Sequence, residues 1–155
     1  MGVGVDVLLV AVAAALGFGT WRALTDGRFR GTHAVRRAEA SAPHAPEAPA
    51  ETRASLLAGT PWAADLGDRA TLLQFSSAFC APCRATRRVL AEVAGMVPGV
   101  RHIEVDAEQH LELVRRLGVL RTPTTLVLDA EGREVTRAAG APTKQAVVAS
   151  LGRFA

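Results

Sequence analysis

The stretch TLLQFSSAFCAPCRATRRV, residues 71–89, decides the fold because it joins a strand pattern to a helical pattern at a pair of cysteines. Its opening residues are mostly aliphatic or β-branched, which predicts a buried strand, and the hydrophobic period changes after Phe79, which predicts a helix start. Cys80 and Cys83 are the only cysteines in the chain. The sequence therefore predicts strand, turn and helix, with both sulfur atoms in the first helical turn.

The spacing of the two cysteines suits disulfide chemistry. Residues three apart on a helix share a face, so we expect their Cα atoms within roughly 4.4 to 6.8 Å, which a disulfide tolerates. The unbonded N–H groups and the dipole at a helix start favour a thiolate, most strongly at Cys80. We therefore predict that Cys80 is the nucleophile and Cys83 the resolving thiol. Pro82 lacks an N–H that this turn would leave unbonded, so it stiffens the dithiol loop at little cost.

Two other interpretations of the cysteine pair stay open. Zinc needs four ligands, yet no second cysteine pair exists and the four histidines lack ligand spacing. These histidines are His33, His44, His102 and His110. Two inert structural cysteines are the stronger alternative, although a Cys-x-x-Cys pair between strand and helix favours a redox dithiol. We predict no metal site and no organic cofactor, because thiol–disulfide exchange keeps its electrons on sulfur.

From about residue 70 to 155 the chain resembles the thioredoxin superfamily. The segment FCAPC, residues 79–83, stands in the place of that family's Trp-Cys-x-x-Cys, and GVLRTPT, residues 118–124, resembles the segment with the family's cis-proline, here Pro123. The two motifs occur in the family's order, about 40 residues apart. Gly140 matches a further family glycine, which follows the strand hairpin.

This resemblance implies a fold and an activity. The fold is an α/β, three-layer α/β/α thioredoxin-like fold with a central mixed sheet. The activity is thiol–disulfide exchange with protein disulfides, for which an upstream thiol or dithiol donor supplies the electrons. Besides the two cysteines, the residues expected to contact substrate are Phe79, Ala81, Pro82, Thr122 and Pro123. Two departures from the family are Phe79, where a tryptophan is usual, and Gln74, where thioredoxins carry a buried acid, so the proton acceptor for Cys83 is unassigned.

The hydrophobic pattern of the remaining chain agrees with that layered fold. We expect a helix over 83–96, a strand over 100–106, a helix over 111–117, a hairpin of 124–128 and 133–137, and a closing helix over 144–154. In the first helix, Val89, Leu90, Val93 and Met96 are expected to face inward. His102 is expected to face solvent. Residues 52–69 suggest a short helix or irregular segment with Trp62 as a packing residue.

Residues 3–21 form an apolar run whose single charge is Asp6. Its 19 residues are about the length that a membrane helix requires, so we predict one N-terminal transmembrane helix. A cleaved signal peptide is the main alternative, because Ala13–Ala15 offers small residues, but no Lys or Arg precedes the run. A buried core helix is the remaining alternative.

Charge predicts the orientation of this helix. Five arginines follow it closely: Arg22, Arg28, Arg30, Arg36 and Arg37. The positive-inside rule then places the thioredoxin-like domain on the cytoplasmic face of the cell membrane, with the extracytoplasmic face as the alternative. The formal net charge of +3 does not indicate nucleic-acid binding, because the basic residues lack interleaved aromatic residues.

Three regions follow from these patterns. They are an anchor at 1–21, a basic juxtamembrane segment with an Ala/Pro-rich linker at 22–51, and the thioredoxin-like domain at 52–155. The predicted function is a membrane-tethered thiol–disulfide oxidoreductase that reduces protein disulfides. The alternatives are an exported reductant or oxidant of the cytochrome-maturation type and a redox-inactive docking module.

Overall fold

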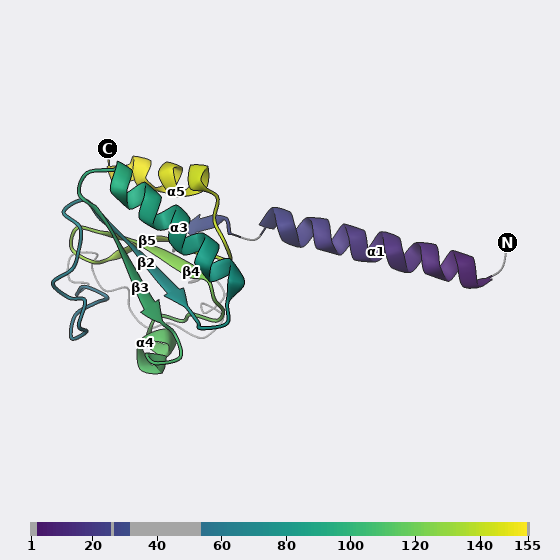
Figure 1. Ribbon diagram of the computed structural model, residues 1–155, viewed down its shortest axis with the longest axis horizontal. Helices are drawn as coiled ribbons and strands as arrows, with labels where there is room; N and C mark the ends of the chain where they lie inside the picture. The colour runs from purple at the N-terminus through teal and green to yellow at the C-terminus, as the bar shows by residue number, and fades with distance from the viewer. Residues whose placement is uncertain (1–2, 26, 32–53, 155) are drawn as a thin grey trace, which may run out of the picture.

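The computed structural model describes residues 3–25, 27–31 and 54–154 (Figure 1). The elements, in chain order, are α1 (Val3–Thr25), β1 (Phe29–Gly31), β2 (Ala70–Ser76), α3 (Ala81–Met96), β3 (Val100–Asp106), α4 (Leu111–Arg116), β4 (Thr124–Asp129), β5 (Glu134–Ala139), α5 (Lys144–Leu151) and the 3₁₀ turn Gly152–Phe154. From β2 onward, every strand and helix predicted from the sequence is present, with ends that differ by only a few residues.

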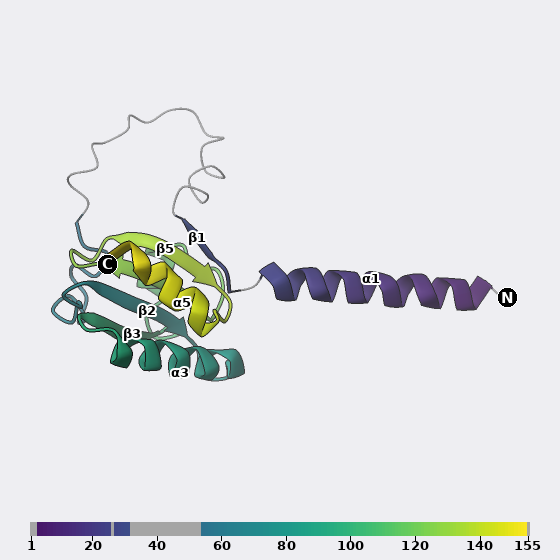
Figure 2. The ribbon, with the colours of Figure 1, turned by 90° about the horizontal axis from the view of Figure 1, so that it is seen from above.

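The strands form one mixed sheet in the order β1-β5-β4-β2-β3. β2 and β3 are parallel, whereas the β2/β4, β4/β5 and β1/β5 pairs are antiparallel. Helices α3 and α5 pack on one face of the sheet, as Figure 2 shows, and α4 lies on the other. The predicted three-layer α/β/α fold with a central mixed sheet is confirmed.

Each face of the sheet buries its own apolar cluster. Alternate residues of a strand point to opposite faces, so Leu72 packs under α3 and α5 while Leu73 packs on the α4 side. The turns at 54–66 cover that second side through Leu57, which is fully buried, and Trp62, which packs beside it. Trp62 is therefore a packing residue, as predicted.

One inward position predicted for the helix after the cysteines is wrong. Leu90 and Val93 are fully buried and Val89 packs partly against the same cluster, but the Met96 side chain is 54% exposed. Met96 is the last residue of α3, and the chain leaves the helix there through Val97, whose backbone is extended. The Met96 side chain, at the end of the helix, is therefore not packed into the core.

The sheet begins earlier in the chain than the sequence suggested. Strand β1 precedes the Ala/Pro-rich segment yet pairs with β5, with Phe29 opposite Ala138 and Gly31 opposite Thr136. The domain boundary suggested at residue 52 therefore leaves out an edge strand. The Ala/Pro-rich segment itself lies outside the described residues.

Helix α1 extends away from the sheet (Figures 1 and 2). Its apolar side chains are exposed, among them Leu8, Val10 and Phe18, each more than 60% exposed. Within the described residues it is the one helix long and apolar enough to cross a membrane, by length and composition.

Candidate active site

The two cysteines lie where β2 gives way to α3. Cys80 is the N-cap of α3, and its Sγ accepts a hydrogen bond of 3.1 Å from the Cys83 N–H. Pro82 lies in the first turn, where its missing N–H costs no helical hydrogen bond. Cys80 and Cys83 are joined as a disulfide with a Cα–Cα distance of 5.2 Å. The predicted placement of both sulfur atoms at the helix start is confirmed.

The two sulfur atoms differ in their surroundings. Cys83 is 2% exposed, whereas Cys80 is half-buried and stands at the mouth of the helix. Ala81 and Pro82 between them are exposed. An external disulfide can therefore approach the Cys80 sulfur while Cys83 stays behind it.

Ser77 connects the dithiol to the loop before β4. Its carbonyl oxygen accepts a hydrogen bond from the Cys80 N–H, and its hydroxyl lies 3.2 Å from the hydroxyl of Thr122. The Thr122–Pro123 peptide bond is cis, and the Pro123 carbonyl accepts a hydrogen bond from the Gly140 N–H. The structure thus brings the two motifs together, as the resemblance implied.

Each of these two motifs carries one large, exposed apolar side chain. Phe79 is 96% exposed and Leu120 is 95% exposed. The sequence pointed to Phe79 as a substrate contact but did not single out Leu120 or Ser77. The signal for Leu120 was its place two residues before Thr122, in the segment whose last residues form the proline loop.

A polar pair lies beneath the dithiol, inside the domain. Gln74 is fully buried, donates from Nε2 to the Cys83 carbonyl at 3.0 Å, and places Oε1 3.2 Å from His102 Nε2. The expectation that His102 faces solvent is therefore wrong, because its ring turns inward to a partner that the neighbouring strand provides. Burial lowers the pKa of His102 below its usual 6.5; the Glu104 carboxylate opposes that shift and Arg87 adds to it.

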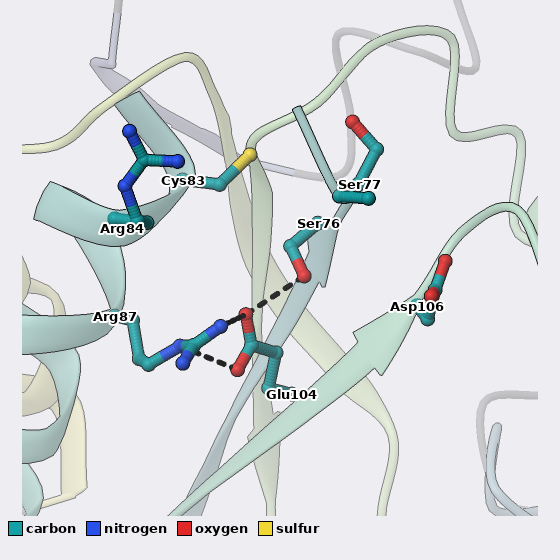
Figure 3. Close-up of a pocket in the computed structure, with 8 residues that line it drawn as sticks. Ser76, Ser77, Cys83, Arg84, Arg87, Glu104 and Asp106 are labelled. Atoms are coloured by element: carbon teal, nitrogen blue, oxygen red, sulfur yellow. Dashed lines mark hydrogen bonds and ion pairs between the residues drawn. The ribbon is translucent and has the colours of Figure 1, made fainter. Parts of the chain in front are cut away.

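An open pocket of about 300 Å³ lies beside Cys83. Figure 3 shows Arg87 reaching from α3 to the Glu104 carboxylate, which also accepts a hydrogen bond from Ser76. Arg84 stands next to Cys83 at the edge of this pocket. The side of the dithiol that faces the pocket is therefore lined by charged and hydroxyl groups, in contrast to the apolar Phe79 and Leu120.

The two histidines within the described residues, His102 and His110, each contact a neighbouring side chain. Among the described residues, no three His, Cys, Asp or Glu side chains are grouped so that they could hold a metal ion. His102 is bonded to Gln74, and His110 packs edge-on against Trp62 with ring centroids 4.8 Å apart. His33 and His44 lie outside the described residues.

Comparisons with known proteins agree with this geometry. The Thioredoxin family model matches residues 56–153, so the chain belongs to the thioredoxin family. Thioredoxin H2-1 of Oryza sativa subsp. japonica is 36% identical over 70 residues, 45% of this chain and 50% of that protein. A thioredoxin of Chlamydia muridarum is 31% identical over 77 residues, 50% of this chain and 74% of the relative.

Solved structures show the same relationship. Fasciola hepatica thioredoxin superposes with a TM-score of 0.51 at 26% identity, covering 57% of this chain and 84% of that one. The chain spans about half the length of the first plant relatives that it matches, Thioredoxin H2-1 and putative thioredoxin H10 of Arabidopsis thaliana. The family model matches residues 56–153, so α1 lies outside that match.

Proposed function

We propose that this chain is a membrane-tethered thiol–disulfide oxidoreductase that reduces protein disulfides. The observation that carries the proposal is the accessible Cys80 sulfur at a helix N-cap, with the buried Cys83 already bonded to it. This arrangement separates an attacking sulfur from a resolving sulfur. Inert structural cysteines would not need one partner exposed at a helix start.

The reaction proceeds in two exchanges. The Cys80 thiolate attacks one sulfur of a substrate disulfide, forming a mixed disulfide and releasing the other substrate sulfur as a thiolate. Cys83, as a thiolate, then attacks Cys80 Sγ, which forms the Cys80–Cys83 bond and releases the second substrate sulfur. The substrate gains two electrons and the enzyme dithiol loses them. An upstream thiol or dithiol donor must return those electrons, and no metal or organic cofactor takes part.

Two features of the helix start favour the attacking thiolate. The Cys83 N–H points at Cys80 Sγ from 3.1 Å, and the first-turn amides of α3 present the positive end of the helix dipole. Arg84, one residue after Cys83, adds a positive charge at the pocket edge. A negative sulfur at Cys80 is thereby stabilised over a neutral thiol.

The wall beside the sulfur offers a place for an extended substrate. Thr122 is half-buried, and its main-chain N–H and C=O have no hydrogen-bond partner within the described part of the chain. An extended peptide that pairs with this main chain would pass Cys80 between the Phe79 and Leu120 side chains. Ala81 and Pro82 are exposed and complete the surface that such a peptide would meet, whereas the Pro123 side chain is buried.

The tether and its orientation are also part of the proposal. α1 has the length and composition of a membrane span, and arginines follow it on the domain side, which the positive-inside rule assigns to the cytoplasm. A cytoplasmic domain faces a reducing pool that keeps the dithiol reduced. We therefore assign the direction as reduction of partner disulfides.

The test uses the full chain in detergent with a short disulfide peptide whose cleavage changes its fluorescence. Cys80→Ser should abolish turnover, whereas Cys83→Ser should accumulate a mixed disulfide visible on a non-reducing gel. A protein that only docks its partner would keep binding the peptide in both variants. It would also show no turnover with the original, unsubstituted chain. That result would overturn the proposal.

A topology experiment tests the cytoplasmic side separately. A single cysteine introduced at Ser41, in a Cys80→Ser, Cys83→Ser background, is labelled in intact cells with a reagent that does not cross membranes. Protection from the reagent until the cells are lysed supports the cytoplasmic face. Labelling in intact cells would place the domain outside and make it an exported oxidoreductase.

A further inference from the structure

The anchor joins the sheet at the same end as the dithiol. α1 ends at Thr25, and residues 26–28 are all that separate it from β1. The Gly27 N–H donates a hydrogen bond of 2.9 Å to the Ala139 carbonyl, at the end of β5. The next residue, Gly140, donates one of 2.7 Å to the Pro123 carbonyl. Two consecutive hydrogen bonds therefore lead from the base of the anchor to the loop beside the cysteines.

The attachment of α1 to the sheet is closely packed at Gly27. Gly27 has a φ of +72°, and a Cβ there would lie 2.2 Å from the Ala141 carbonyl oxygen, so the contact accepts glycine alone. Arg121, next to Thr122, donates a hydrogen bond of 2.8 Å to the same Ala139 carbonyl. The base of the anchor is thus held against the loop that carries Thr122 and Pro123.

Strand spacing sets the distance between anchor and dithiol. Neighbouring strands lie about 4.8 Å apart, so three spacings from β1 across β5 and β4 to β2 amount to roughly 14 Å. The chain from Thr25 to Phe29 makes four Cα–Cα steps of at most about 3.5 Å each, or roughly 14 Å together. The dithiol end of the domain therefore lies within roughly 28 Å of the end of α1.

The direction of the strands agrees with this distance. In Figure 2 the arrowheads of β2 and β5 point toward the side from which α1 leaves the domain. Cys80 follows the end of β2. The Ala/Pro-rich segment comes after β1, so its length does not increase the distance between the anchor and the dithiol. A membrane around α1 would face the redox end of the domain.

We propose that the redox end faces the bilayer, and that its partner is a disulfide on a short, membrane-surface segment of another integral membrane protein. This inference rests on the proposed function. A gap of at most about 14 Å admits an extended chain but excludes a folded 100-residue domain, whose radius of gyration of about 13 Å corresponds to a diameter of more than about 26 Å. Phe79 and Leu120, almost fully exposed, would contact such a segment. The exchange is the one described above, with two electrons passing from the dithiol to that disulfide.

Distance to lipid headgroups tests the orientation without measuring activity. The full chain, as Cys80→Ser, Cys83→Ser, carries a nitroxide at Leu120→Cys or at Ala130→Cys in nanodiscs containing gadolinium-chelating lipid. The hairpin turn at Ala130 lies beyond the other end of β4, six residues or about 20 Å away. We expect stronger relaxation at position 120 than at 130. Equal or reversed relaxation would overturn the inference.

Two controls guard this measurement. A second pair, Phe79→Cys and Asp68→Cys beyond the two ends of β2, replaces the first pair if that pair disturbs folding. We expect stronger relaxation at position 79 than at position 68. About twenty Gly and Ser residues inserted after Thr25 add a mean reach of roughly 25 Å and should reduce the difference. A chain that does not stay with the nanodisc would overturn both the tether and this inference.

Partner class is tested with two substrates on the same nanodiscs. A disulfide peptide attached to lipid by a short spacer should be reduced several-fold faster than a folded soluble disulfide protein of about 100 residues, and the Gly/Ser insertion should narrow that ratio. Equal rates without the insertion would refute the partner class. Loss of all peptide reduction with the relaxation difference intact would instead refute the exchange function while the orientation stands.

Discussion

Gln74 donates a hydrogen bond from Nε2 to the carbonyl oxygen of Cys83, 3.0 Å away across the contact between β2 and α3. The Oε1 atom of the same amide lies 3.2 Å from His102 Nε2. An uncharged side chain therefore connects the main chain of Cys83 to the imidazole of His102. Of these two side chains, only the His102 imidazole can take up a proton, because an amide does not titrate.

Removal of the Gln74 amide should destabilise the domain. Gln74→Ala leaves a cavity and removes the hydrogen bonds of the amide to the Cys83 carbonyl and to His102, so the free energy of unfolding should fall by about 2 to 4 kcal/mol. Gln145→Ala, at an exposed site on α5, is the matched control and should stay within about 0.5 kcal/mol. Urea unfolding followed by Trp62 fluorescence in a Trp21→Phe background measures both. Similar losses in the two variants would contradict a structural role for the amide.

His102 should make the domain less stable in mild acid. Its pKa is lowered in the folded state by burial, against the opposing Glu104 and with Arg87 adding to the shift. Above about pH 6.5 both states are neutral and the ring has no effect; as the pH falls through that value, the unfolded chain takes up the proton first. Stability is therefore lost until the pH passes the lower, folded-state pKa.

The measurement is a series of urea midpoints between about pH 7 and 5, compared with His102→Gln. Glutamine keeps a hydrogen-bonding group near Gln74 but has no charge to acquire. The original chain should lose more stability over this range than the variant. Parallel pH profiles would show that the ring protonates equally well in both states.

Two buried threonines should respond oppositely to the same substitution. Thr125 Oγ1 has no hydrogen-bond partner within the described structure, whereas Thr71 Oγ1 accepts a hydrogen bond of 2.9 Å from the Gly67 N–H. Thr125→Val removes a buried, unpaired hydroxyl and should leave stability unchanged or raise it by about 1 kcal/mol. Thr71→Val strands a buried N–H and should cost about 1 to 3 kcal/mol. Thr71 on β2 and Thr125 on β4 are both fully buried. An equal loss of stability in the two variants would therefore contradict this difference in hydrogen bonding.

The sequence was sufficient wherever local pattern and burial agree. The aliphatic run before Phe79 and the period change after it predicted β2, α3 and the positions of Cys80 and Cys83. His102 was misjudged because its inward turn depends on Gln74, which lies 28 residues earlier on the neighbouring strand. A single-sequence pattern shows that a strand alternates, but not which polar side chain the next strand offers.

The edge strand β1 was missed for a related reason. Phe29–Gly31 is three residues long, too short to show a period, and it pairs with β5 more than a hundred residues later. Its neighbouring arginines indicated a juxtamembrane segment instead. Leu120 was overlooked because the exposure of a loop side chain cannot be read from a sequence. Only the structure shows that Leu120, like Phe79, is almost fully exposed.

The docking of β1 can be tested at Gly27. Gly27 and Gly59 have nearly the same positive φ, +72° and +74°, but only Gly27 faces main-chain atoms, with a Cβ placed 2.2 Å from the Ala141 oxygen. Both alanine variants incur the left-handed backbone cost of roughly 1 to 2 kcal/mol. Gly27→Ala must in addition push the chain away from Ala141.

We therefore expect Gly27→Ala, and not Gly59→Ala, to release β1 from β5. Hydrogen–deuterium exchange should become faster at residues 28–31 and at the β5 amides that pair with them, while β2 and α3 keep their protection. Faster exchange throughout the sheet would mean that β1 stabilises the whole domain. Unchanged exchange at β1 would mean that the attachment of α1 to the sheet does not depend on this contact, and the short distance between α1 and the dithiol would lose its support.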